Sequence, residues 1–309
     1  MIGGIDIVTL IAALMAASTP VLLAATGELV AEKAGVLNLG VEGMMIVGAV
    51  AGFATAVTTG SPVLGFAGGA LAAALMASLF ALLTQVFLSN QTATGLALTL
   101  FGLGLSALAG KGFEGVRPPP TGKVPFGPLA DLPVVGPIVF GHDWMVYVSL
   151  ALVAAVWAFL KYARLGLILR AVGENHDAAH ALGYRVIAVR FAALAFGGAL
   201  AGLGGAYLSL VRVPQWTEGM TAGAGWIALA IVVFASWRAE RVLIGAYLFG
   251  GITALQLQLQ AAGYAIPVHF LSMAPYVITV LVLVVLSATH RYGAPAAPAA
   301  LGRTFHASN

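Results

Sequence analysis

Long apolar runs recur along the chain, separated by short polar stretches. A helix needs about 20 residues to cross the hydrocarbon core of a bilayer, and most of these runs approach or exceed that length. The runs are continuous and rich in Ala, Leu and Gly, which favours helices over the alternating pattern of a membrane β-barrel. The predicted spans are residues 5–25, 43–59, 63–88, 92–109, 144–160, 191–211, 226–237, 242–261 and 270–289.

This pattern predicts an all-α polytopic membrane protein in which residues 1–290 form one transmembrane domain. Because the second, fourth and seventh runs are short or interrupted by glycine, we expect about eight to ten membrane helices, some broken or re-entrant. The first run is expected to remain in the protein as a helix. No basic residue precedes it, and Asp6 lies near its start, unlike a cleavable signal peptide.

Lys and Arg are concentrated in loops that the predicted topology places on one side of the membrane. Such loops face the cytoplasm, which puts the N-terminus outside, the C-terminus in the cytoplasm and the proline-rich loop 111–143 outside. The Ala- and Pro-rich tail 291–309 is predicted to be disordered and cytoplasmic. The basic residues that set this orientation are Lys161, Arg164, Arg170, Arg185 and Arg190 in segment 161–190, followed by Arg238, Arg241, Arg291 and Arg303.

Composition agrees with a lipid environment. Of the 309 residues, 61% are hydrophobic and only 8% are charged, whereas a soluble domain carries about 25% charged residues. The chain has too few charges to cover a water-facing surface, which excludes a soluble enzyme, a disordered protein and a nucleic-acid-binding domain. It also contains no cysteine, so disulfides and thiolate chemistry are excluded.

Two segments, 35–45 and 216–226, do not resemble lipid-facing helix. Each contains Glu-Gly-Met and small residues and leads into an apolar run. The predicted topology places them on opposite sides, as expected of an inverted repeat whose halves each contribute a broken helix near the midplane. We expect Asn38, Glu42, Trp216, Glu218 and Trp226 to line or gate a path for a polar solute. Alternatively, the two glutamates cap helix N-termini and the tryptophans belong to an interfacial belt.

Segment 161–190 contains a short capped helix. Asn175 is a good N-cap and Gly183 a good C-terminal stop, with about two turns between them. Ala178, Ala181 and Leu182 share one face of these turns. This face either docks in a groove of another protein or packs on its own bundle.

His176 and His180 have the i, i+4 spacing of zinc-binding helices, but Asp177 stands where such helices carry Glu, and a third ligand is not evident. We therefore expect no metal, and solvated histidines are the simpler interpretation. Two further patterns are missing. Gly110-Lys111-Gly112 lacks the rest of a phosphate-binding loop, and ionisable residues are scarce within the predicted spans, which argues against ion coupling.

Three motifs resemble bacterial ABC-importer permeases of the branched-chain amino acid/ribose permease superfamily. Residues 32–45 are similar to the early signature, and the wording of residues 38–45 resembles the nucleoside and simple-sugar branch. Residues 170–183 are similar to the cytoplasmic coupling segment, and residues 217–230 resemble the later signature. The resemblance covers residues 27–287. This chain departs from it at His176, where proline is usual, and at Ala224, where arginine is common.

The resemblance implies a permease subunit without an ATP site or cofactor of its own, in the bacterial cytoplasmic (inner) membrane. ATPase subunits that bind ATP and Mg would dock on this chain. A second permease, usually a different chain, would complete the pathway, and an external binding protein would deliver a nucleoside or simple sugar. No nucleic acid is involved. The residues implied in coupling are Glu174, Asn175, Ala178, Ala179, Leu182 and Gly183.

Three alternatives remain open from the sequence. A branched-chain amino acid permease of the same superfamily would share the motifs. A secondary transporter would work without an ATPase but would need a site for its coupling ion. A membrane metallopeptidase would rest on His176 and His180.

Overall fold

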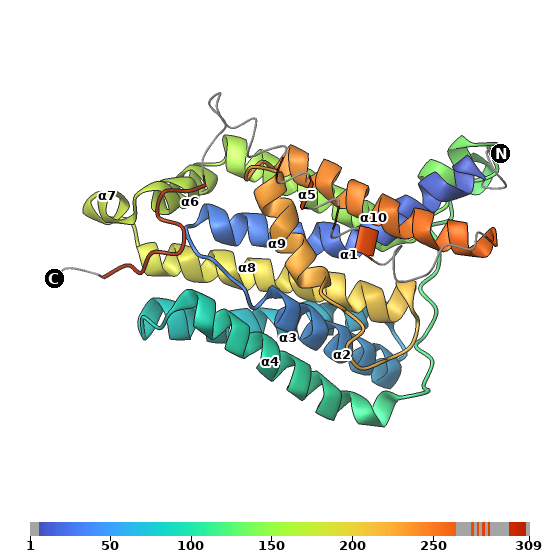
Figure 1. Ribbon diagram of the computed structural model, residues 1–309, viewed down its shortest axis with the longest axis horizontal. Coiled ribbons are helices and arrows are strands. Elements are labelled where there is room, and N and C mark those ends of the chain that lie inside the picture. Colours follow the sequence, from blue (N-terminus) through green and yellow to red (C-terminus); the bar gives the residue numbers. More distant parts are fainter. Residues whose placement is uncertain are drawn as a thin grey trace.

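The computed structural model describes residues 6–263 and 297–306, with isolated positions between 273 and 284. Within these residues the regular structure is helical, and the only strand-like pairings are two isolated bridges. Most helices lie roughly along the long axis of the molecule (Figure 1). They are α1 (Ile7–Lys33), α2 (Val41–Thr59), α3 (Pro62–Ala81), α4 (Gln91–Gly110), α5 (Trp144–Tyr162), α6 (Arg164–Glu174), α7 (His176–Ala181), α8 (Val186–Tyr207), α9 (Ala224–Phe234) and α10 (Ala239–Ala261).

The described part confirms the prediction of an all-α polytopic membrane protein. Seven helical segments are long and apolar enough to cross a membrane, namely α1 to α5, α8 and α10, three of them extended by short π- or 3-10-helical turns. α9 has only 11 residues, or about 16 Å at 1.5 Å per residue, too short to cross alone. The predicted span 270–289 lies outside the described residues, apart from isolated positions.

Glycines bring the central helices into backbone contact. A Cβ added at Gly48 of α2 would lie 2.8 Å from the carbonyl oxygen of Gly202 in α8, and one at Gly69 of α3 would lie 2.7 Å from that of Gly48. Close approach at small residues lets van der Waals packing hold membrane helices together. The high glycine content therefore serves the packing of α2, α3 and α8 in the centre of the bundle.

α1 extends eight residues beyond the predicted span, to Lys33. Its last turns contain Glu28 and Glu32, both 1% exposed. The apolar run ends at Ala25, and Thr26 and Gly27 are poor helix formers, but most of residues 28–33 are good ones and the helix continues through them. The expectation of few ionisable residues concerned the predicted span 5–25, and the longer observed helix adds two buried glutamates to it.

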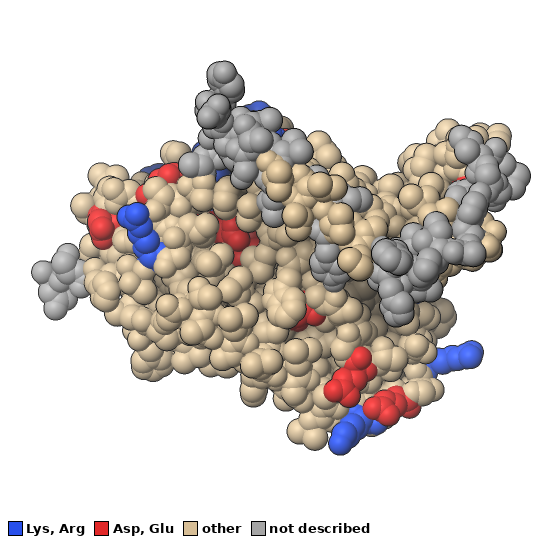
Figure 2. Space-filling model, viewed as in Figure 1, with Lys and Arg blue, Asp and Glu red and all other residues tan. Residues whose placement is uncertain are grey.

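The two ends of the bundle are distinct. One end carries α6, α7 and segment 297–306, and the other carries the irregular loop between α4 and α5 (Figure 1). At the loop end, the Asp143 carboxylate accepts hydrogen bonds from the N–H groups of Met145 and Val146 and from the Tyr207 hydroxyl, which joins the start of α5 to the end of α8. Charged side chains lie mainly at these two ends, with largely uncharged surface between them (Figure 2).

The expected disorder of tail 291–309 does not hold for residues 297–306. The Ala300 N–H donates to the Gly173 carbonyl at 2.9 Å, and the Gly302 N–H donates to the Gly35 carbonyl at 3.2 Å. Phe305 is 5% exposed and packs with a small apolar cluster next to α7. The Ala/Pro composition suggested too little apolar surface for this segment to fold. The burial of Phe305 and the hydrogen bonds to the Gly173 and Gly35 carbonyls nevertheless hold it in place.

Candidate solute path and coupling surface

The connection between α1 and α2 is not helical, and side chains satisfy its backbone. The Asn38 N–H donates to Glu28 Oε1 at 3.3 Å, and the Asn38 side-chain oxygen accepts from the Gly40 N–H at 3.0 Å. Asn38 is 1% exposed. Asn38 therefore stabilises a buried turn, in which the irregular backbone must form its hydrogen bonds with protein groups.

α4 holds the same connection from its other side. The Leu37 N–H donates to Gln91 Oε1 at 2.9 Å, and the Thr99 hydroxyl donates to the Leu39 carbonyl at 3.1 Å. Thr99 lies near the middle of α4. The connection thus returns from the α6–α7 end of the bundle to about half the depth of α4 before α2 begins.

Glu42 joins the two Glu-Gly-Met segments. Its Oε1 accepts hydrogen bonds from the Thr221 hydroxyl at 2.5 Å and the Gly223 N–H at 2.9 Å, while its Oε2 accepts from the Gly225 N–H at 2.7 Å. The carboxylate is buried, with the residue 3% exposed. It satisfies N–H groups at the start of α9, where an anion is favoured by the helix dipole.

The N-termini of α2 and α9 therefore meet inside the molecule. α2 begins at Val41 and runs toward the loop end, whereas the short α9 begins at Ala224 and runs toward the end that carries α6 and α7 (Figure 1). The short α9 agrees with the expectation of a broken helix, whereas α2, at 19 residues, is long enough to cross a membrane. Glu42 caps a helix N-terminus, as in the alternative interpretation of the two glutamates, but the helix it caps is α9, which begins within segment 216–226, and not its own helix α2. Half-helix N-termini are favourable places for polar or anionic groups.

The other three predicted path residues differ in their surroundings. Trp216 is 2% exposed and packs against Gly110, at the loop end of α4. Glu218 is exposed, and Trp226 is 49% exposed in the first turn of α9, directly after Gly225. The structure thus places Glu42 and Trp226 at the junction and puts Trp216 in a core cluster at one end.

Sequence reasoning missed Glu28, Glu32 and Gln91, all 3% exposed or less. Glu28 holds Asn38, Glu32 accepts a hydrogen bond from the Trp237 indole N–H, and Gln91 holds Leu37. The two glutamates are four residues apart, so they lie on one helix face. This spacing directly after an apolar run was the available signal.

The predicted coupling helix forms as expected. Asn175 Oδ1 accepts a hydrogen bond from the Ala178 N–H at 2.9 Å, which makes Asn175 the N-cap of α7. Gly183 has φ +86° and ends the helix, and the Tyr184 N–H donates to the Ala179 carbonyl at 3.1 Å. Both local predictions, the N-cap and the glycine stop, are confirmed.

Only some of the residues assigned to coupling lie on the exposed face of α7. Ala178 is exposed and Leu182 is 76% exposed, so both are accessible to a partner. Ala179 is 2% exposed and packs with Val172 and Val186. Glu174 ends α6, and its Oε2 accepts a hydrogen bond from the Ala299 N–H at 3.4 Å. Ala179 therefore supports the segment from inside, Glu174 holds Ala299 from the exposed side, and Ala178 and Leu182 present the surface of α7.

His176 and His180 are engaged with protein groups. Their rings lie 5.4 and 5.2 Å from the Phe305 ring, and His176 Nδ1 lies 3.1 Å from Arg190 Nη2. In the described part, no group of three or more His, Asp or Glu side chains is placed to hold a metal ion. Burial, and then the Arg190 charge, lower the pKa of His176 below its ordinary value, against the opposing effect of Asp177.

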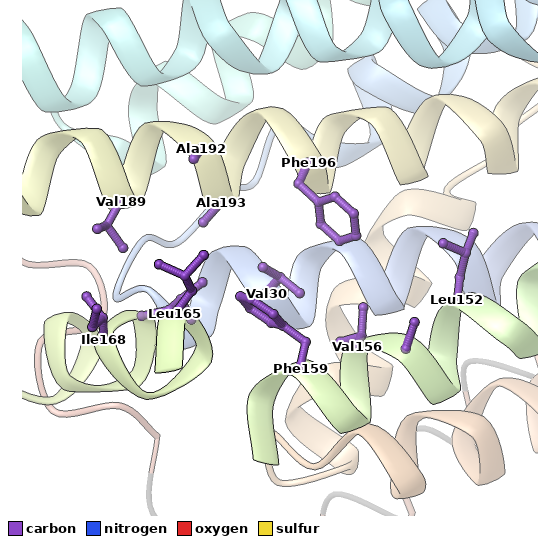
Figure 3. Close-up of a pocket in the computed structure, with 12 residues that line it drawn as sticks. Val30, Leu152, Val156, Phe159, Leu165, Ile168, Val189, Ala192, Ala193 and Phe196 are labelled. Carbon is purple, nitrogen blue, oxygen red and sulfur yellow. The ribbon is translucent and has the colours of Figure 1, made fainter. Parts of the chain in front are cut away.

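A cavity of about 470 Å³ lies between α5, α6 and α8, with Val30 of α1 on its wall (Figure 3). Its lining side chains are all apolar, and none is a predicted path residue. Phe159 of α5, Leu165 of α6 and Phe196 of α8 point into it (Figure 3). A path for a polar solute needs hydrogen-bonding groups, so this cavity is a poor candidate for it.

Comparisons with known proteins agree on one family. Residues 10–286 match the model of the branched-chain amino acid transport system / permease component family. The putative glucose ABC transporter permease protein TsgC13 of Haloferax volcanii is 44% identical over 83% of this chain and 79% of its own length. The nucleoside ABC transporter permease protein NupC of Lactococcus lactis is 32% identical, covering 89% and 90%. The guanosine ABC transporter permease protein NupQ of Bacillus subtilis is 30% identical, covering 90% and 93%. No solved structure matches the chain.

Proposed function

The chain belongs to the branched-chain amino acid transport system / permease component family, and from this premise we propose that it forms the membrane pathway of an ABC importer for a nucleoside or simple sugar. Relatives named for glucose, nucleoside and guanosine transport support this solute class. These solutes share a hydroxyl-rich sugar ring, which needs hydrogen-bonding groups along its path.

The observation that carries the proposal is the Glu42 junction. The N-termini of the membrane helix α2 and the short helix α9 meet inside the molecule and give a polar environment within a bundle otherwise built from apolar helices. In the proposed mechanism, movement of α2 against α9 opens the path first to one side and then to the other. Glu42 and Trp226 face the solute or its gate, while Asn38 keeps the connection into α2 in place.

The energy is proposed to come from separate subunits. ATPase subunits that bind ATP and Mg dock on the exposed face of α7, at Ala178 and Leu182. This chain contributes no ATP site and no chemistry. A second permease, a different chain, completes the path, and an external binding protein delivers the solute. The complex lies in the cytoplasmic (inner) membrane, with α6 and α7 in the cytoplasm and the N-terminus outside.

A branched-chain amino acid is the second candidate solute, because the matching family is described by that transport system. It differs in chemistry from a sugar or nucleoside, since it carries two opposite charges and an apolar side chain. Competition between solutes therefore separates the two candidates directly.

The test is to purify the chain with its partners from native membranes, reconstitute the complex in liposomes and supply ATP inside or outside the vesicles. We expect a P-loop ATPase to co-purify and ATP-dependent uptake to be inhibited by excess nucleoside or sugar and not by leucine. Inhibition by leucine alone would assign the second candidate. Uptake by the purified chain without any ATPase would overturn the importer proposal.

A further inference from the structure

Arg190 is a fully buried cation that touches four separate parts of the chain. Its side chain is 0% exposed. Nε donates to the Ala34 carbonyl at 3.2 Å, and Nη1 donates to Gln85 Oε1 at 3.2 Å and to the Arg303 carbonyl at 3.1 Å. Nη2 lies 3.1 Å from His176 Nδ1 of α7. One guanidinium thus links α7, the connection after α1, the turn after α3 and segment 297–306.

The acceptors around Arg190 are neutral. Among the described residues, no carboxylate forms an ion pair with it. His176 Nε2 lies 3.6 Å from Asp177 Oδ1, a contact that is an ion pair only when His176 is protonated. Burying a charge without a counterion is costly, so every remaining hydrogen bond matters. A residue that served only to fill this space would be apolar. Arg190 instead holds separate segments of the chain together through its hydrogen bonds.

Segment 297–306 runs from the coupling segment to the connection after α1. Its backbone hydrogen bonds join Ala300 to Gly173 of α6 and Gly302 to Gly35. Phe305 packs against the His176 and His180 rings and joins the Val172, Ala179 and Val186 cluster. The segment thus crosses between the two places that Arg190 also joins, and we call residues 297–306 the strap.

We propose that Arg190 and the strap transmit movement of α7 to the connection between α1 and α2, and so to the Glu42 junction. The inference rests on the proposed function, because it assumes that an ATPase acts on α7. Contacts are continuous along the whole route. α7 holds Arg190, Arg190 and the strap hold Ala34 and Gly35, and the connection that follows leads within seven residues to Glu42. Arg190 is in this scheme a positioning residue and touches no solute.

Continuity of contacts is not by itself evidence of coupling, so the test measures coupling directly. The variants are Phe305→Ala, Arg190→Gln and Arg190→Lys, with His306→Ala as the matched control because His306 is exposed beside Phe305. Each is reconstituted with its ATPase in liposomes, where ATP hydrolysis and solute uptake are measured together. Melting temperatures identify any variant that fails to fold, in which case Phe305→Ala, which leaves the Arg190 side chain and its hydrogen-bond partners in place, remains the test.

The expected result for Phe305→Ala and Arg190→Gln is that the ATPase still co-purifies and hydrolyses ATP, while solute moved per ATP falls about fivefold or more, as ordinary coupling energies imply. Arg190→Lys should recover part of the loss, and His306→Ala should match the wild type. An unchanged ratio in Phe305→Ala, or equal losses of hydrolysis and uptake, would overturn the proposal. A wild-type complex without ATP-dependent uptake would instead count against the proposed function.

Discussion

The Glu42 carboxylate and the Gly225 N–H, 183 positions apart in the chain, lie 2.7 Å apart in a buried hydrogen bond. Gly225 is there because nothing larger fits. A Cβ added to it would lie 2.5 Å from the backbone nitrogen of Glu42. Glu42 supplies the hydrogen-bond acceptor, and Gly225, which has no side chain, lets the two backbones approach closely enough for the bond to form. The two motifs that share Glu-Gly-Met in the sequence are thereby joined in one structural unit.

Replacing Glu42 by alanine should abolish uptake and lower stability. The N–H groups of Gly223 and Gly225 would lose their acceptor, at about 1–3 kcal/mol for each buried group. Glu42→Gln keeps the shape but loses the charge, and its NH₂ group meets donors, so we expect an intermediate loss. Melting temperature in detergent and uptake in liposomes measure both effects. Wild-type stability of Glu42→Ala would show that the junction does not hold α2 and α9 together.

Gly225→Ala should separate α2 from α9 by steric conflict. Overpacking of this kind costs about 1–3 kcal/mol, and here it also moves the junction, so uptake should fall more than stability predicts. Gly104→Ala is the matched control, since a Cβ at Gly104 of α4 meets nothing within 4 Å. We expect it to be neutral or slightly stabilising. Equal behaviour of the two variants in melting and uptake would contradict the close packing at Gly225.

The two neighbouring alanines of α7 should respond differently to a charged side chain. Ala178→Glu places the charge on the exposed face, so it should reduce co-purification of the ATPase and leave the melting temperature of the isolated permease unchanged. Ala179→Glu buries the charge against Val172 and Phe305, and should lower that melting temperature. Quantitative pull-down and thermal unfolding check both. Normal ATPase binding by Ala178→Glu would remove this face from the docking surface.

His176 should make the permease less stable in mild acid. Burial and the Arg190 charge lower its pKa in the folded protein, so the folded state takes up a proton less readily than the unfolded state, whose pKa is about 6.5. Stability is therefore unaffected above that pH and falls as the pH drops below it. His176→Gln keeps an acceptor for Arg190 and removes the titration, so it should flatten melting temperature against pH.

Asp177 provides a second test of the lowered pKa of His176. Asp177 raises the pKa of His176, so Asp177→Asn should lower the midpoint of the His176 titration further. An NMR titration of the imidazole resonance reports this midpoint directly. A midpoint that rises in Asp177→Asn, or a wild-type midpoint above 6.5, would contradict the placement of His176 against Arg190.

The sequence allowed accurate predictions of helix ends that depend only on neighbouring residues. The N-cap at Asn175 and the stop at Gly183 depend on neighbours within a few residues, and the structure confirms both. The predicted boundaries of the spans were less accurate, because a hydropathy pattern ends a span at the first charged residues even where the helix continues, as α1 does to Lys33. α1 continues through Glu28 and Glu32, which accept hydrogen bonds from Asn38 and from the Trp237 indole, and a partner 205 positions away, as Trp237 is from Glu32, leaves no trace in a local window.

The same limit applies to the site residues. Trp216 and Glu42 occur in similar motifs, yet one fills a core beside Gly110 and the other joins the N-termini of α2 and α9. Ala178 and Ala179 are identical residues, and only the packing of Phe305 and Val186 makes one of them surface and the other core. Sequence spacing gives a helix face but not which neighbour covers it.

The sequence alone determined that this protein is a bundle of membrane helices with two interrupted segments, because apolar length and breaks in it follow from the need to satisfy the backbone within lipid. It also determined the capped helix α7, whose hydrogen bonds are local. Only the tertiary structure decided that Glu42 meets Gly225, that Arg190 is buried, and that residues 297–306 pack beside α7. Each of these depends on groups more than 100 positions apart whose hydrogen bonds form only once the bundle brings them within reach.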